Sequence, residues 1–98
     1  MDMQSLTTLP DAELLSQVKR LAHAERQATA RLVAHLAELD KRKLYLQEGC
    51  ASLFTYCVQV LHLSEAAAYN RIETARAATR FPAVLASLEQ GDVHLKAI

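Results

Sequence analysis

The longest uninterrupted hydrophobic pattern in the chain runs from residue 11 to residue 40, a stretch without glycine or proline. When the residues are stepped at 100° each, one set of side chains falls within about 40° of a single line, as on one face of an α-helix. The set consists of Leu14, Val18, Leu21, Glu25, Ala28, Leu32, Leu36 and Leu39. The pattern therefore predicts one helix of about thirty residues, which would be about 45 Å long.

A helix of that length exceeds what a compact domain of this size needs, because such a domain has a radius of gyration of about 13 Å. We therefore expect part of the apolar line to pack on something outside the fold, and a second copy of the chain is the simplest candidate. The predicted homodimer interface consists of Leu14, Val18, Leu21, Leu32 and Leu36. Glu25 interrupts this line. It either meets an arginine across the interface or lies on an exposed stretch, and the second alternative is favoured.

Shorter apolar patterns downstream predict three more helices, near residues 52–61, 64–80 and 82–90. Ser52 and Ser64 stand where N-cap residues are expected, and Pro82 ends one helix and opens the next. In the helix predicted for residues 64–80, the inner line consists of Ala68, Ile72, Ala75 and Thr79. We expect an all-α fold in which residues 1–10 form a leader and residues 11–98 a single helical domain. Gly91 suits a helix stop, and the apolar residues after it indicate a further element of a longer protein.

The stretch from Leu61 to Ile72 has the plan of a helix-turn-helix corner. An apolar helix end and a tight turn lead into a new helix, which Ser64 caps and where Glu65 lies at the positive end of the helix dipole. Plain α-hairpins share this pattern. Two features also speak against a DNA-reading corner, since position 62 is histidine where such turns often carry glycine, and Glu65 would face phosphates.

The formal charge is balanced, with eleven basic and eleven acidic residues, whereas free-standing nucleic-acid binders are usually more basic. Between residues 41 and 80, however, six basic residues face three acidic ones. Asparagine can pair with adenine, and arginine with guanine or phosphate. The candidate DNA-binding residues are Lys41, Arg42, Lys43, Ser64, Tyr69, Asn70, Arg71 and Arg76. An ordinary solvated surface explains the same charges, and residues 41–43 also suit the negative end of a helix dipole.

Composition narrows the remaining alternatives. Hydrophobic residues make up 51% of the chain, with two glycines, two prolines and no tryptophan, which is typical of a helical protein. We find no apolar run long enough for a membrane span and no signal-peptide pattern, and therefore expect a cytoplasmic protein without membrane contact.

Cys50 and Cys57 would lie about 10 Å apart along a helix, too far for a disulfide, so we expect buried free thiols. The histidines are scattered and no catalytic, cofactor-binding or metal-binding motif is visible, so we expect a non-catalytic segment without a small-molecule substrate.

From Lys43 onward the chain resembles the N-terminal helical region found ahead of HNH nuclease domains in many bacterial proteins. The residues that carry the resemblance are Tyr45, Gly49, Ser52-Leu53, Tyr56-Cys57, Leu63-Ser64, Ala68, Arg71-Ile72, Ala75-Arg76, Phe81-Pro82, Leu88, Gly91 and His94-Leu95. The upstream segment ERQATARLVAHLAELDKRKLY is similar too. The resemblance implies a larger parent whose C-terminal HNH domain cuts DNA with a divalent metal. Its His-Asn-His residues would lie beyond Ile98, and His94 is not one of them.

Two functions follow from these observations. The first is a non-catalytic DNA-binding or DNA-positioning module of an HNH endonuclease-like protein, which could act as a dimer. The second is a helical dimerisation or protein-interaction module without direct DNA contact.

Overall fold

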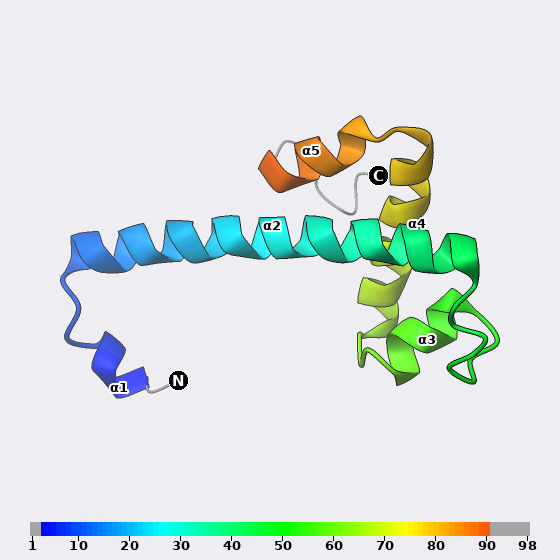
Figure 1. The fold of residues 1–98 in the computed structure, drawn as a ribbon. Coiled ribbons are helices and arrows are strands. Elements are labelled where there is room, and N and C mark those ends of the chain that lie inside the picture. Colours follow the sequence, from blue (N-terminus) through cyan, green and yellow to red (C-terminus); the bar gives the residue numbers. More distant parts are fainter. Residues whose placement is uncertain (1–2, 91–98) are drawn as a thin grey trace.

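The computed structural model describes residues 3–90, and this part of the chain contains helices and no strands (Figure 1). In chain order the elements are α1 (Met3–Leu6), α2 (Asp11–Arg42), α3 (Leu53–Gln59), α4 (Glu65–Arg80) and α5 (Ala83–Gln90). The predicted all-α fold, with a long N-terminal helix followed by shorter ones, is confirmed. Gly91 and the apolar residues that follow it lie outside the described residues, so the predicted further element is not among these helices.

The long helix α2 begins at Asp11, as the apolar pattern predicts, and ends two residues later than expected. Pro10 precedes it in an extended conformation, and Asp11 and Glu13 lie in its first turn, where the helix dipole favours negative charge. At the other end Lys41 and Arg42 occupy the last turn, and Lys43 closes the helix in a left-handed conformation (φ 53°). The N–H of Lys43 donates to the carbonyl oxygen of Asp40 at 3.1 Å.

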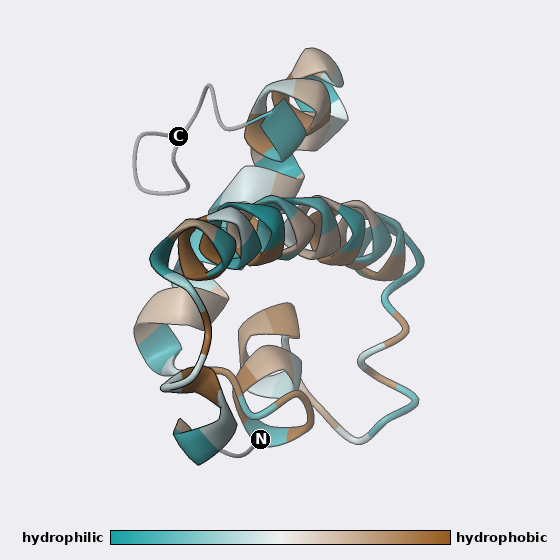
Figure 2. Ribbon diagram, turned by 90° about the vertical axis from the view of Figure 1, so that its left-hand side faces the viewer, coloured by the Kyte–Doolittle hydropathy of each residue, from teal (hydrophilic) through white to brown (hydrophobic). Residues whose placement is uncertain are grey.

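The other helices gather around the C-terminal half of α2. Helix α4 crosses this half, α3 packs on α4 below it, and α5 lies along α2 on the other side (Figure 1). The apolar sectors of these helices meet in one core (Figure 2). Its buried members are Ala30, Val33, Leu36, Leu53, Cys57, Ala68, Ile72, Ala75, Ala78 and Leu88.

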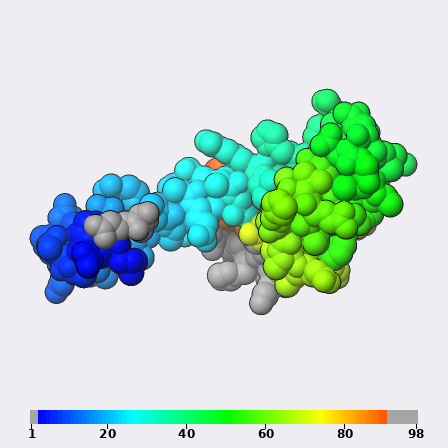
Figure 3. Space-filling view, turned by 90° about the horizontal axis from the view of Figure 1, so that it is seen from below, coloured from blue at the N-terminus to red at the C-terminus, as the bar shows by residue number. Residues whose placement is uncertain are grey.

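The N-terminal half of α2 takes no part in this core. Every residue from Asp11 to Glu25 is exposed, and we call this segment the arm. The arm projects from the body as a rod with α1 at its far end (Figure 3). The molecule accordingly measures 49 × 29 × 18 Å, and its radius of gyration of 16.3 Å exceeds the roughly 13 Å of a compact domain of about this size.

The inner face of α4 differs from the predicted line in one respect. Ala68, Ile72 and Ala75 are buried as expected, but Thr79 is exposed, whereas Thr74, which the periodicity places outside, is completely buried. The reason is that α4 contacts α2, α3 and α5, so that its buried sector is wider than a single stripe. The Thr74 hydroxyl donates to the Asn70 carbonyl oxygen at 2.8 Å, which satisfies its polar group inside the core.

Within the described residues, no helix has both the length and the apolar character that crossing a membrane requires.

Candidate nucleic-acid interface

The corner between α3 and α4 is closed by the predicted serine cap. Ser64 is extended (φ −64°, ψ 160°), and its Oγ accepts a hydrogen bond from the Ala67 N–H at 3.1 Å. Ser52 caps α3 in the same way, by accepting from the Thr55 N–H at 3.1 Å. Each cap satisfies one of the amide groups that a helix start leaves without a partner, so these two side chains set where α3 and α4 begin.

The turn in this corner is longer than expected, because α3 ends at Gln59 rather than near residue 61. Residues 60–64 connect the helices, and the Leu63 N–H donates back to the Cys57 carbonyl oxygen at 3.0 Å. Leu61 and Leu63 are half-buried against the core, while His62 between them is exposed. His62 has φ 60°, a left-handed conformation usually taken by glycine. The histidine therefore stands at the position where a turn of this kind favours glycine.

The exposed face of α4 carries both signs of charge. Tyr69, Glu73, Arg76 and Arg80 are exposed and, at 100° per residue, fall within about 40° of one line along the helix. Tyr69 is the one aromatic residue of α4, and its side chain is 61% exposed. The negative charges of Glu73 on this line and of Glu65 at the start of the helix offset the positive charges of the two arginines.

Two predicted base-reading residues lie off this exposed line. Asn70 and Arg71 are half-buried. The Arg71 Nε is shielded from solvent and has no hydrogen-bond partner within residues 3–90. Arg71 therefore contributes packing as well as charge.

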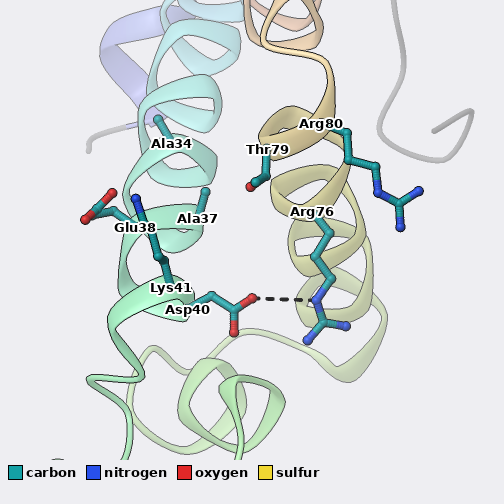
Figure 4. A pocket seen from close by; sticks show the side chains of 8 residues that line it. All are labelled: Ala34, Ala37, Glu38, Asp40, Lys41, Arg76, Thr79 and Arg80. Carbon is teal, nitrogen blue, oxygen red and sulfur yellow. Dashed lines mark ion pairs between the residues drawn. The ribbon is translucent and has the colours of Figure 1, made fainter.

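An open groove of about 550 Å³ separates the C-terminal part of α2 from α4 (Figure 4). Its lining is formed by Ala34, Ala37, Glu38, Asp40, Lys41, Arg76, Thr79 and Arg80. Lys41 and Arg76 belong to the predicted DNA-binding set and come together here from two helices. Arg80, which that set omits, joins them one turn beyond Arg76.

The carboxylates of the groove partly neutralise its cations. The Arg76 Nε lies 3.7 Å from the Asp40 Oδ2, and both side chains are partly exposed. Arg42 Nε donates to Glu38 Oε2 at 2.7 Å, and this hydrogen bond, with the charge of Arg42, lowers the pKa of Glu38. Exposed pairs of this kind contribute little to stability, so their arginines can exchange partners at small cost.

The remaining candidates lie apart from the groove. Ser64 and Tyr69 lie at the N-terminal end of α4. Lys43 is exposed, and its backbone closes α2. Lys41, Arg76 and Arg80 thus line one groove, although the Arg80 side chain points away from α2 (Figure 4). Tyr69 lies on the same line of α4 as the arginines, and Asn70 and Arg71 are half-buried. We call Tyr69, Arg76 and Arg80 of α4, together with Lys41 of the adjacent α2, the α4 surface.

The predicted dimer residues divide into two groups. Leu14, Val18 and Leu21 are 41%, 55% and 61% exposed on the arm. Leu32 is half-buried against the core, and Leu36 is only 2% exposed within it. Because Leu36 is already covered by the chain's own helices, only the arm leaves the predicted interface open to a partner.

Both cysteines are buried and free, as expected. Burial raises the pKa of the Cys57 thiol. Among residues 3–90, no group of three or more histidine, cysteine, aspartate or glutamate side chains is placed to hold a metal ion.

No protein-family model, curated protein or solved structure matches this chain. The relation to HNH-associated helical regions stays a prediction from the residues quoted above.

Proposed function

We propose that the chain is a non-catalytic helical module that contacts DNA through the α4 surface. The observation that carries this proposal is that Lys41 of α2 lines one groove together with Arg76 and Arg80 of α4, the helix that follows the capped corner. Cations held in one place by packed helices suit the phosphate backbone, which supplies most of the affinity of non-specific DNA binding.

The residues have different roles in this proposal. Lys41, Arg76 and Arg80 contact phosphates, with Arg76 leaving Asp40, while Tyr69 contacts a sugar or base edge. Glu65 and Glu73 oppose binding, so the affinity is modest and directed by the few cations present. As the resemblance implies, the module would position a parent protein on DNA, and the divalent metal and catalytic residues would belong to an HNH domain beyond Ile98.

The test is a fluorescence-anisotropy titration of this chain with a short labelled duplex, at low and at physiological salt. We expect binding that weakens steeply with salt, and a salt slope that falls by about 1 for each phosphate contact removed. Lys41→Ala and Arg80→Ala are the informative variants, because both side chains are exposed. Arg71→Ala is less informative, since it also removes packing.

Arg20→Ala is the matched control. It removes one exposed cation from the arm, about 30 Å along α2 from Lys41. Equal loss of binding in Arg20→Ala and Arg80→Ala would count against the α4 surface, and absence of binding even at low salt would exclude DNA contact by these residues.

A second candidate function, a helical interaction module without DNA contact, is favoured by a separate observation. The arm exposes Leu14, Leu15, Val18 and Leu21 at 41–62% of their surface, on a part of α2 that the other residues described by the structure leave uncovered. Exposed apolar clusters of this kind mark contact sites. This candidate predicts association that persists when DNA binding is absent.

A further inference from the structure

We infer that Asp40 restrains DNA binding by the α4 surface, because its carboxylate takes the place of a DNA phosphate on Arg76 in the free protein. This inference rests on the proposed function and deepens it by naming a residue that regulates the same site. Asp40 is not a member of the predicted DNA-binding set, and its effect on binding is opposite to that of the cations around it.

The two arginines of the groove have different neighbours. Arg76 and Arg80 lie one turn apart on α4, and both are exposed. The carboxylate of Asp40 reaches Arg76 from α2, with 3.7 Å between the Arg76 Nε and the Asp40 Oδ2 (Figure 4). The Arg80 side chain points away from α2, and within residues 3–90 no acidic side chain pairs with it. Arg80 can therefore meet a phosphate directly, whereas Arg76 must first leave Asp40.

The Asp40 carboxylate is held more firmly in the groove than the guanidinium that it faces. The Asp40 side chain is 29% exposed, on the part of α2 that packs against the other helices, whereas the longer Arg76 side chain is 58% exposed. DNA binding would therefore move Arg76 and leave Asp40 in place. The carboxylate would then face the incoming phosphate without its counter-charge, and like charges at short range oppose binding.

The other carboxylate of the groove is engaged differently. Glu38 also lines the groove, but its Oε2 accepts a hydrogen bond from the Arg42 Nε at 2.7 Å. Arg42 does not belong to the α4 surface, so the charge of Glu38 is compensated without occupying a cation of that surface. Among residues 3–90, Asp40 is thus the acidic residue that pairs with a proposed phosphate-contacting side chain.

The exposure of the pair limits how strongly it can inhibit. Exposed ion pairs are weak, so Asp40 should reduce the affinity for DNA several-fold and not abolish binding. Salt screens both the pair and the repulsion between the carboxylate and the phosphate. The inhibition should therefore be largest at low salt and become smaller at physiological salt.

The first experiment is a fluorescence-anisotropy titration of Asp40→Asn with the same labelled duplex, at low and at physiological salt. Asparagine keeps the size and polarity of the side chain and removes its charge. We expect binding several-fold tighter than in the wild type at low salt, with a smaller difference at physiological salt. The Tm should stay close to that of the wild type, because an exposed pair contributes little to stability.

A double-mutant cycle shows whether Asp40 acts through Arg76. Asp40→Asn is measured alone and together with Arg76→Ala, and the two singly substituted proteins and the wild type complete the cycle. If Asp40 restrains binding by holding Arg76, its replacement should tighten binding much less once Arg76 is absent. Equal tightening with and without Arg76 would mean that only the long-range charge of Asp40 matters, and it would overturn the inference.

Glu13→Gln is the matched control for net charge. It removes one negative charge from an exposed position of α2, about 40 Å along the helix from Asp40. Binding by this variant should stay close to that of the wild type. Tightening by Glu13→Gln equal to that by Asp40→Asn, or no tightening by Asp40→Asn, would also overturn the inference.

Failure of this inference is distinguishable from failure of DNA contact. A wild type that binds the duplex and is weakened by Lys41→Ala and Arg80→Ala, but is not improved by Asp40→Asn, rejects the role of Asp40 and leaves the DNA-binding module standing. Absence of binding at low salt in the wild type and in Asp40→Asn alike rejects both proposals.

Discussion

His62 has a backbone conformation that costs most residues energy. Its φ of 60° is left-handed, and for a residue with a Cβ this costs about 1–2 kcal/mol. Its side chain is exposed, so replacing it removes little packing. We expect His62→Gly to stabilise the fold by about 0.5–1 kcal/mol, because the relief of strain exceeds the extra freedom of glycine in the unfolded chain.

Thermal unfolding followed by circular dichroism checks this prediction, with an expected rise in Tm of a few degrees. His62→Val is the control. A β-branched residue fits this conformation worse than histidine and should lower the Tm. If glycine destabilises the protein as much as valine does, the histidine side chain has a contact that outweighs the backbone strain.

Cys57 makes the stability of the fold depend on pH in the alkaline range. Its side chain has no exposed surface, and burial raises the pKa of the thiol above its ordinary value of 9.0. The folded state therefore holds the thiol proton more tightly than the unfolded chain. The stabilising contribution is fully present below pH 9 and is lost as the pH rises through the folded-state pKa.

We expect the free energy of unfolding to fall between pH 8 and about pH 11 by less in Cys57→Ala than in the wild type. Urea titrations at both pH values measure the free energy of unfolding of each protein. Because each protein is compared with itself at the other pH, the packing that Cys57→Ala loses cancels. The native thiol should also react slowly with a water-soluble disulfide reagent. An equal pH dependence in both proteins would show that other groups cause the alkaline loss.

Among the elements, α2 is the one whose two halves have different roles. Leu36 is 2% exposed in the core, whereas Leu14 on the same line of the helix is 41% exposed. We expect Leu36→Ala to cost about 2–5 kcal/mol, since it leaves a cavity in a packed region. Leu14→Ala should change stability by about 0.5 kcal/mol or less. Denaturant unfolding at low micromolar concentration gives both values, and similar costs would mean that the arm is buried within the monomer.

The starts of the helices could be predicted because their causes are local. Ser52, Ser64 and Pro10 act within one helical turn, and the structure has helices beginning directly after all three. The identity of the buried threonine could not be predicted. Thr74 and Thr79 are both polar β-branched residues on one helix, and only the arrangement of three neighbouring helices decides which of them is enclosed.

At the scale of the whole molecule, the candidate site depends on contacts that span the sequence. The cations of α4 and the basic end of α2 are visible in the sequence, but the groove that unites Lys41 with Arg76 and Arg80 requires α4 to cross α2. The over-long apolar line correctly predicts that α2 extends past its own core. It does not show where the core ends, because Leu36 and Leu14 follow the same periodicity.

The arm and the body should respond differently to dilution, and hydrogen exchange can resolve them. In dilute solution the amides of residues 11–25 lack tertiary cover, so the arm should fray and exchange fast, while α3 and α4 are protected up to the global stability. If the exposed leucines of the arm bind a second copy, as the apolar line predicts, exchange in residues 11–25 should slow at about 100 µM in the wild type and in Ser16→Glu but not in Leu21→Glu. Protection of the arm at every concentration would mean that the helix is stable without a partner, and it would count against the interaction module.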